Sequence, residues 1–322
     1  MIQLATKAQP VKSLPTTYHL YGLPINSLLP LFGPKDDAAT KAEIEIVRGT
    51  RRFFSKIRLD AVPVDRSPNI SYYSLADGSD YIQFFEIFEF WVSPDGKKIA
   101  YRNLKRNFCF EPALGYLQAN VLSFALLKMG MEPLHANAIV TDEGAIGFIG
   151  DSGYGKSTLA AHFIKSGFSL LTDDVLVIRK VGKSFYACPG TPRIKIFPEM
   201  AERFGFPAAG VPMNPDTKKL IFPLSTNQTR SQSVRLKCLY TLNPPDIQDQ
   251  SKQIRVRKLK KHEAALEIVK AAHNLVVKTS ARFARQFLFA TELAREIPVY
   301  SLSYPRDLKR LPEVQKIILS HS

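Results

Sequence analysis

The fold of this chain is decided by the stretch Gly150-Asp151-Ser152-Gly153-Tyr154-Gly155-Lys156-Ser157-Thr158. It matches the pattern G-x-x-x-x-G-K-[ST] at every fixed position. The apolar run 145–149 before it is typical of a short buried strand, and residues 158–165 after it carry Leu, His and Phe at helical spacing. A strand, a glycine loop and a helix in this order predict a phosphate-binding loop. A chance glycine turn before a helix is the weaker interpretation, because it leaves the flanking strand unexplained.

The residue types in this stretch suit a bound triphosphate. Glycines let the backbone curl so that its N–H groups point at an anion, and the N-terminus of the following helix adds a partial positive charge. Lys156 is long enough to reach the β- and γ-phosphates, and the hydroxyl of Ser157 is a ligand for Mg²⁺. We therefore predict that all nine residues from Gly150 to Thr158 form the nucleotide-binding loop.

Length and composition indicate an ordinary globular protein. The chain has 322 residues, of which 45% are hydrophobic and 23% charged, and this length suffices for two domains. No apolar run is long enough to cross a bilayer, and the start, MIQLATKAQPVKSLP, lacks the features of a signal peptide. The three cysteines, Cys109, Cys188 and Cys238, have no metal or disulfide spacing. We expect a cytoplasmic protein whose cysteines are small buried hydrophobic residues.

The net charge of +15 raises the question of an acidic partner. Lysines and arginines are spread along the chain, and the densest cluster, residues 255–262, follows an alternating strand and enters a helix. No RNA- or DNA-binding motif accompanies it. A solvated basic face is therefore the favoured interpretation, and we expect neither nucleic acid nor a membrane as partner.

The first part of the chain predicts a β-rich module. Strands are expected at 18–25, 42–47, 72–75, 82–92 and 98–101. No nucleophile–base pair or metal-ligand spacing occurs there, so a role in docking or recognition is expected. A helix opens at Pro112, carries an apolar stripe typical of a core, and ends before Gly130. We predict a β-rich N-terminal module at 1–110 and a catalytic domain at 111–322.

The remainder of the chain alternates strands and helices, which predicts an α/β fold. Around the loop, strands are expected at 136–140, 145–149, 169–172 and 175–178. Further strands are expected at 185–188, 193–197, 236–242, 253–259 and 299–303, and helices at 198–205, 263–272, 283–295 and 312–319. Residues 207–219 are rich in Pro, Gly and Asn and predict a mobile loop.

Two adjacent carboxylates, Asp173 and Asp174, follow the loop helix at the edge of an apolar strand. Burying them there is costly unless a cation compensates. In phosphate-loop proteins one such Asp binds Mg²⁺. Strand neighbours point to opposite faces, so the two carboxylates are expected to have different tasks. A helix or turn cap is the alternative, but an apolar strand follows the pair. A lone histidine such as His135 is usually structural.

Taken together, these features are specific. The order and separations of His135, GDSGYGKST and Asp173-Asp174 resemble the catalytic domain of bacterial HPr kinase/phosphorylase, and GFSLLTDDVLVI is similar to the family's segment after the loop helix. The resemblance is close over about residues 131–180 and weak elsewhere. It implies a P-loop, HPr-kinase-like catalytic domain that uses ATP and Mg²⁺.

The resemblance also implies roles for single residues. Lys156 and Ser157 would hold the phosphates and Mg²⁺, and Asp174 would assist the metal. Asp173 would take the proton from the attacking hydroxyl, and His135 would lie beside the reacting phosphoryl group. Positioning, positive charge and one base are what phosphoryl transfer requires.

Four further basic residues are candidate partners for the phosphates: Arg193, Lys195, Lys218 and Lys219. Arg193, on a short strand after Pro-Gly, is also predicted to be catalytic. Ordinary surface charge is an equally good interpretation of each.

The chain departs from the family at two places. Thr158 stands where the bifunctional enzymes usually carry Glu, and PGTPRIKIFP at 189–198 replaces their second signature. These differences count against HPr as the acceptor and against reverse phosphorolysis. The segments YHLYGLPINSLLPL, PRIKIFPE and YPRDLKRLPEV are similar to HPr-kinase-like proteins that phosphorylate lasso-peptide precursors.

The sequence thus predicts a kinase acting on a Ser or Thr hydroxyl of a peptide or small protein. One rival is a nucleotide-hydrolysing regulator without a phosphoacceptor, and another is a non-catalytic binding protein that uses the basic face. The acceptor, the choice between ATP and GTP, and assembly into a homo-oligomer stay open at this stage.

Overall fold

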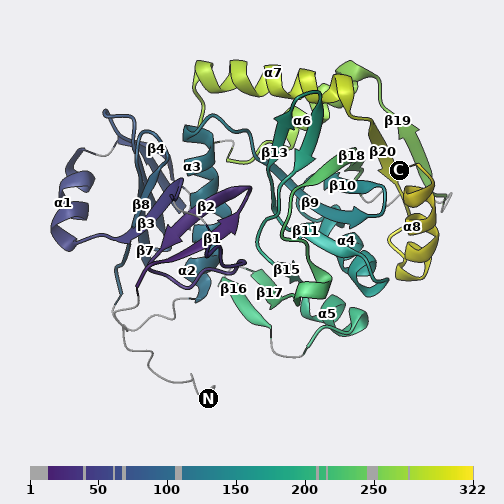
Figure 1. Cartoon of the computed structure of the whole chain (residues 1–322), viewed down its shortest axis with the longest axis horizontal. Coiled ribbons are helices and arrows are strands. Elements are labelled where there is room, and N and C mark those ends of the chain that lie inside the picture. The colour runs from purple at the N-terminus through teal and green to yellow at the C-terminus, as the bar shows by residue number, and fades with distance from the viewer. Residues whose placement is uncertain are drawn as a thin grey trace.

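The computed structural model describes residues 14–38, 41–60, 62–66, 70–105, 111–207, 210–214, 217–244, 253–274 and 276–321. The chain is a mixed α/β protein, as predicted. An N-terminal sheet lies at one side of the molecule and a second sheet, flanked by helices, at the other (Figure 1). Cys109 falls outside the described residues, while Cys188 and Cys238 are free thiols buried in the core, as expected.

The N-terminal sheet has eight strands in the order β1-β2-β3-β8-β7-β6-β5-β4. Their bounds are β1 (Thr16–Leu20), β2 (Leu23–Ser27), β3 (Ile44–Arg48), β4 (Val62–Arg66), β5 (Ile70–Ser74), β6 (Asp80–Phe84), β7 (Phe88–Val92) and β8 (Lys98–Asn103). Most neighbours are antiparallel, but β3 runs parallel to both β2 and β8. The β-rich character predicted for this part of the chain is confirmed.

Two strand predictions in this module were wrong. Residues 18–25 form two antiparallel strands, because Tyr21 and Gly22 turn the chain at φ +57° and +78°. Residues 82–92 likewise form a hairpin, in which Phe85 and Glu86 adopt φ +50° and +51°. Bulky residues rarely adopt this left-handed conformation, so the turn at Phe85-Glu86 has no usual sequence signal, and at the first turn only Gly22 provides one.

The helix α1 (Arg51–Asp60) was not predicted. Its sequence is strongly basic, so the few apolar residues of its buried face do not form a clear helical pattern. The ring of Phe54 on that face is fully buried and packs near Tyr81 of β6, with ring centroids 6.3 Å apart. Phe53 and Ile57 pack in the same cluster, so a short apolar face fixes this helix to the sheet.

The helix expected after Pro112 is present and contains a π-helical turn. It comprises α2 (Glu111–Tyr116), the π-helix Leu117–Val121 and α3 (Leu122–Lys128). Its apolar stripe packs in one hydrophobic cluster with the N-terminal sheet, and the cluster also includes Val175, Val177 and Cys188. The stripe is therefore core, as predicted, and this helix joins the two parts of the molecule. The boundary near residue 110 stays a prediction.

The second sheet holds the predicted nucleotide core. Its strands run in the order β11-β9-β10-β18-β14-β13, with β12 beside β9 and β20 beside β18 and β19. Their bounds are β9 (Leu134–Thr141), β10 (Gly144–Ile149), β11 (Ser169–Thr172), β12 (Val175–Leu176), β13 (Ile178–Val181), β14 (Ser184–Ala187), β18 (Val234–Leu242), β19 (Arg255–Lys258) and β20 (Val299–Ser303). The central strands β10, β18 and β20 are parallel, so their carboxyl ends share one edge.

Helices cover both faces of this sheet (Figure 1). One apolar cluster packs α4 (Lys156–Lys165), α5 (Pro198–Phe204) and α8 (Leu311–Ser320) on one face. Another packs α6 (Lys261–Lys270) and α7 (Ser280–Glu296) on the other. Among the described residues, no helix is long and apolar enough to span a membrane.

A small third sheet corrects one prediction. Residues 207–219 were expected to be a mobile loop, but their described part forms most of a hairpin of β16 (Val211–Asn214) and β17 (Thr217–Pro223). β17 also pairs with β15 (Arg193–Ile196). The pairing fixes the basic residues of this segment in strands beside the core.

Candidate functional site

The predicted phosphate loop lies at the carboxyl edge of the central strands. β10 ends at Ile149, the loop follows, and α4 begins at Lys156. Gly155, at φ +93°, directly precedes the helix, and a Cβ atom there would lie 2.4 Å from the guanidinium of Arg306. Only glycine fits this conformation and this space without strain. The strand–loop–helix context expected from the motif is present.

Lys156 lies inside the curve of the loop. Its ammonium donates hydrogen bonds to the carbonyl oxygens of Gly150, at 2.5 Å, and Asp151, at 3.1 Å. The side chain is buried, and this burial lowers the pKa of its amine. The charges of Asp173 and Asp174 also act on it, so the loop and the paired carboxylates share one electrostatic environment.

The two carboxylates lie in the short link between β11 and β12. The hydroxyl of Thr172 donates to the carbonyl of Val175 at 2.6 Å, and Ala136 of β9 donates its N–H to the carbonyl of Asp174 at 3.1 Å. Asp174 adopts φ +70°, an unusual conformation for a residue other than glycine. Strained backbone of this kind persists where surrounding contacts impose it, and it is frequent at functional sites.

The two carboxylates have different partners. The Oδ2 atom of Asp173 accepts a hydrogen bond from the backbone N–H of Lys195 at 2.8 Å. Its Oδ1 atom is buried and accepts none from any described residue. Asp174 forms an ion pair with the ammonium of Lys195. One carboxylate therefore keeps a free oxygen, while the other is neutralised by a cation.

These environments move the two pKa values apart. Burial raises the pKa of Asp173 to about 7, and the negative charge of Asp174 adds to the rise. Burial alone would raise the pKa of Asp174 too, but Lys195 and His135 outweigh it and hold that pKa below its usual range. A pair in which one carboxylate titrates near neutrality while the other stays ionised is typical of catalytic sites.

His135 lies at the start of β9, where it pairs in register with Val175. Burial and the charge of Lys156 lower the pKa of its imidazole. Two residues further along the same strand, Asn137 is fully buried, and neither polar atom of its amide has a partner among the described residues. Alternate residues of a strand share a face, so His135 and Asn137 project to the same side of the sheet.

The four basic candidates differ in position. Arg193 and Lys195 are buried on β15, and Lys219 lies half-buried on β17 with its ammonium 5.4 Å from the ring centre of Phe197. The charge of Lys219 acts on both carboxylates and on His135. Lys218 is exposed, since adjacent strand residues point to opposite faces. The structure thus brings three of the four residues to the carboxylates.

Arg193 contacts the N-terminal module as well. Its guanidinium donates to the carbonyl of Gly115 at 3.3 Å and lies 5.5 Å from the ring centre of Phe32. Its Nε and Nη1 atoms have no partner among the described residues. Arg193 is therefore buried where the two parts of the molecule meet.

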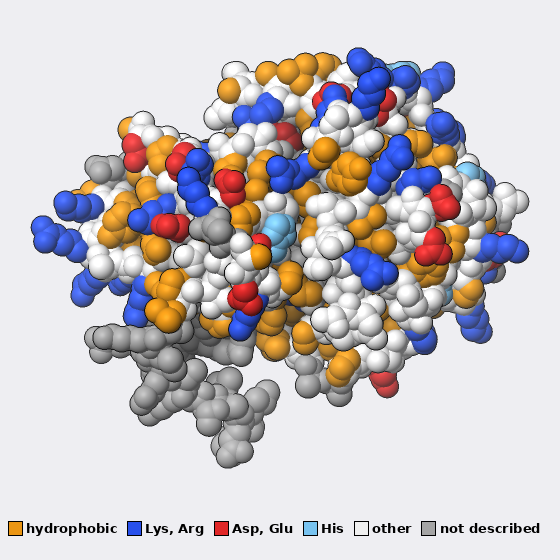
Figure 2. All heavy atoms as spheres, in the orientation of Figure 1, with side chains coloured by type: hydrophobic (Ala, Val, Ile, Leu, Met, Phe, Trp, Pro, Cys, Tyr) orange, Lys and Arg blue, Asp and Glu red, His pale blue; other side chains and the backbone are white. Residues whose placement is uncertain are grey.

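The charges around the carboxylates leave the site positive. Four cations, namely Lys156, Lys195, Lys219 and Arg193, lie in the field of the paired carboxylates, and with the loop carboxylate Asp151 counted the formal surplus is one positive charge. A magnesium–triphosphate complex carries net negative charge, so this surplus suits it. Elsewhere on the face drawn in Figure 2, lysines and arginines are scattered and form no single continuous patch.

The residues present fit a magnesium ion that arrives with a nucleotide. Mg²⁺ prefers oxygen ligands and is usually held by one or two carboxylates, a few waters and substrate phosphates. Asp174 supplies a carboxylate, Ser157 a half-buried hydroxyl in the first turn of α4, and Asp173 an oxygen without a partner. Within the described residues, no group of three or more His, Cys, Asp or Glu side chains forms a self-sufficient metal cage.

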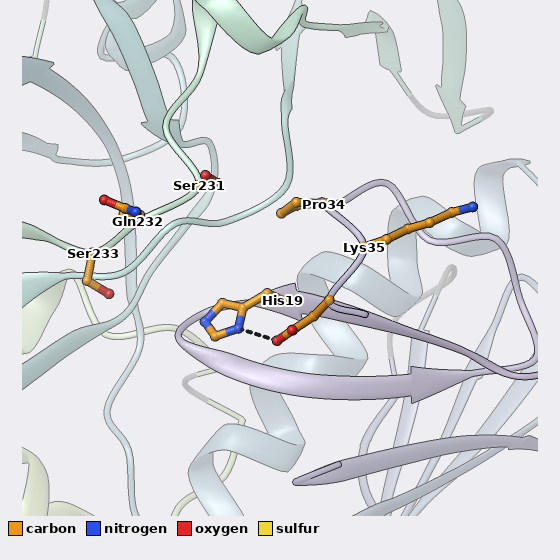
Figure 3. A pocket seen from close by; sticks show the side chains of 7 residues that line it. His19, Pro34, Lys35, Ser231, Gln232 and Ser233 are labelled. Atoms are coloured by element: carbon orange, nitrogen blue, oxygen red, sulfur yellow. Dashed lines mark hydrogen bonds and ion pairs between the residues drawn. The ribbon is translucent and has the colours of Figure 1, made fainter. Parts of the chain in front are cut away.

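A separate cleft of about 400 Å³ lies outside this site. Ser231, Gln232 and Ser233 lie on one side of it, and His19, whose imidazole contacts Asp36 at 3.1 Å, lies on the other (Figure 3). Because Ser233 precedes β18 and the phosphate loop follows the parallel strand β10, the cleft is at the opposite edge of the sheet.

Comparison with known proteins gives little further guidance. No protein-family model and no curated protein matches the chain. Among solved structures, the Hpr(Ser) kinase/phosphatase from Coxiella burnetii is similar, with a TM-score of 0.33 and 15% sequence identity over 59% of this chain and 95% of that chain. A likeness of this size decides neither the fold nor the activity, and nothing is inferred from it.

Several residues of the site carry no sequence signal. Lys195 reaches both carboxylates only because β15 folds back beside them, which spacing along the chain does not reveal. Asn137 and Tyr21 look like ordinary strand residues until their neighbours are known. Lys195 was predicted as a charge partner of the phosphates, and the structure shows an ion pair with Asp174 instead.

Proposed function

We infer that the protein is a kinase that transfers the γ-phosphoryl group of ATP, with Mg²⁺, to a Ser or Thr hydroxyl of a peptide or small protein. The observation that carries the proposal is the free Oδ1 atom of Asp173, buried beside the phosphate loop on a carboxyl group with a pKa near 7. A base that titrates near the working pH is what activation of a hydroxyl requires.

In the proposed reaction, the loop N–H groups and Lys156 hold the triphosphate. Asp173 takes the proton from the acceptor hydroxyl as its oxygen bonds to the γ-phosphorus, while the bond to the β-phosphate oxygen breaks and ADP leaves. Asp174 and Ser157 would hold Mg²⁺, which supplies charge neutralisation at the phosphates. His135 would form a hydrogen bond beside the transferred group.

The acceptor is proposed to bind outside the loop, against the N-terminal module and the β16–β17 hairpin. Tyr21 of the N-terminal module donates its N–H to the carbonyl of Pro189 at 2.7 Å, close to the strand that carries Lys195. The hairpin carries Lys219, whose charge acts on both carboxylates. A lasso-peptide precursor is one candidate acceptor, and a cytoplasmic setting is part of the proposal.

Label transfer tests the proposal directly. The full chain is incubated with γ-labelled ATP, Mg²⁺ and a panel of Ser- and Thr-containing peptides, and labelled peptide and free phosphate are measured together. Label on a peptide, absent with Lys156→Ala, supports a kinase. Release of free phosphate with no acceptor labelled supports the second candidate, a nucleotide-hydrolysing regulator, because the free oxygen of Asp173 would serve water as well as a hydroxyl. If neither labelled peptide nor free phosphate is formed, both the kinase and the regulator proposals are overturned.

A further inference from the structure

Lys195 holds both carboxylates of the site with two different groups. Its backbone N–H donates to Asp173 at 2.8 Å, and its ammonium pairs with Asp174. The ammonium is almost fully buried, at 6% exposure of the side chain. The antiparallel pairing of Lys195 with Ile221 of β17 fixes the backbone contact. A change of side chain at this position therefore alters the partner of Asp174 and leaves the backbone contact to Asp173 in place.

The ammonium of Lys195 occupies the carboxylate of Asp174, which a divalent cation would need as an oxygen ligand. Asp174 is ionised, and among the described residues Lys195 is the only one that forms an ion pair with it. Asp173 is buried and the side chain of Asp174 is 21% exposed, and two adjacent carboxylates so far removed from water are unfavourable without a cation nearby. Lys195 thus supplies locally the charge that a metal ion would otherwise supply.

We propose that Lys195 is the resident counter-ion of Asp174 and that it excludes divalent metal until a nucleotide is bound. A free metal ion would have to displace the ammonium while Lys156 and Lys219 repel it. A metal–nucleotide complex brings negative phosphates, to which the released ammonium of Lys195 can turn. Metal and nucleotide therefore bind with strong positive coupling. This inference rests on the proposed nucleotide site, and it adds that the metal ion binds with the nucleotide and not before it.

The test measures metal binding without turnover. Mn²⁺ replaces Mg²⁺, and its binding to the full chain is followed by electron paramagnetic resonance without nucleotide. Lys195→Met is expected to bind free Mn²⁺ about tenfold more tightly than the wild type, because a unit positive charge in contact with the Asp174 carboxylate has been removed. The same variant is expected to bind metal-free ATP more weakly. Lys218→Met, at an exposed lysine of the neighbouring hairpin, is the matched control and should change neither affinity.

Two outcomes overturn the proposal. One is free Mn²⁺ affinity in Lys195→Met equal to or below that of the wild type. The other is wild-type protein that binds Mn²⁺ as tightly without as with a non-hydrolysable ATP analogue, a measurement that does not depend on any variant folding. Lys195→Gln serves as a second variant if thermal unfolding shows that Lys195→Met is unstable. Failure of the kinase proposal gives a different result. The wild-type protein then transfers no label to a peptide, although Lys195→Met still changes the affinity for Mn²⁺.

Discussion

Two buried acidic clusters, one in each part of the molecule, differ in how completely they are satisfied. In the N-terminal module, Glu89 is fully buried on β7, and both of its oxygens have partners. Arg102 donates to Oε1 at 2.6 Å, while Arg58 and the hydroxyl of Tyr81 donate to Oε2 at 3.2 and 2.9 Å. Every polar atom of this carboxylate is used within the fold.

The cluster beside the phosphate loop is incomplete. Asp173 has one oxygen without a partner in the described part of the chain, and the guanidinium of Arg193 and the amide of Asn137 also have orphan atoms. Buried polar groups without partners cost free energy, so folds rarely retain them without a use. We call the Glu89 cluster closed, because its carboxylate is fully hydrogen-bonded, and the Asp173 cluster open. The closed cluster is interpreted as structural, and the open cluster as a site that a ligand completes.

The largest expected effect distinguishes Lys156 of the loop from Lys128 of α3. Lys156→Ala should lower nucleotide turnover by about 10⁴-fold, because it removes the cation at the transferred phosphoryl group. Lys128→Ala removes the lysine that pairs with Asp80 in the N-terminal module at 3.1 Å, and it should cost stability but not turnover per folded molecule. Turnover assays beside thermal unfolding check both. Full activity of folded Lys156→Ala would refute the phosphate-loop assignment.

Substitutions of the two carboxylates of the open cluster, Asp173 and Asp174, should impair the protein in different ways. Asp173→Asn should still bind Mg-ATP but transfer phosphate about 10³-fold more slowly, since the base is lost. Asp174→Asn should in addition change the dependence of activity on Mg²⁺ concentration. Calorimetric titration with Mg-ATP and transfer assays are made on the same samples. Near-wild-type behaviour of both variants would remove the distinction between the residues.

The closed cluster should respond in stability. Glu89→Gln leaves two arginines facing a neutral amide, and we expect the free energy of unfolding to fall by about 3 kcal/mol. Both arginines are partly exposed, so water can relieve part of the loss. Denaturant titration measures the change, and transfer activity per folded molecule should stay constant. A loss of activity without loss of stability would show that Glu89 belongs to the functional site.

The pH dependence follows from the raised pKa of Asp173. Between its ordinary value of 3.8 and about 7, the folded protein keeps a proton that the unfolded chain has released. The stability of the wild type should therefore fall relative to Asp173→Asn as the pH rises from 5 to 8. Transfer needs the ionised base, so its rate should rise about tenfold between pH 6 and pH 8. A flat rate profile, or stability curves that stay parallel, would count against this role of Asp173.

The sequence correctly predicted the secondary structure near the loop, and it predicted the rest of the chain less well. The apolar run before Gly150, the helix after it and the carboxylate pair all have local signals, so β10, α4 and Asp173-Asp174 lie where they were predicted. The turn at Tyr21-Gly22 places a bulky tyrosine before its glycine, and the turn at Phe85-Glu86 has no glycine, proline or asparagine at its left-handed residues, so two hairpins were taken for single strands. The contact of Lys195 with Asp174 depends on the register of β15, which no local pattern encodes.

The smallest effect is expected where the two parts meet, at Tyr21. Its hydroxyl donates to the carbonyl of Gln118 at 2.8 Å, and its backbone N–H holds Pro189. Tyr21→Phe removes only the hydroxyl contact, so the free energy of unfolding should fall by about 1 kcal/mol while nucleotide affinity stays unchanged. Tyr186→Phe, at a half-buried tyrosine whose hydroxyl makes no hydrogen bond in the described part of the chain, is the control. Because Tyr21 also lies in the field of Arg193 and both carboxylates, a drop in transfer far larger than the drop in stability would show instead that the N-terminal module contributes a group to the reaction itself.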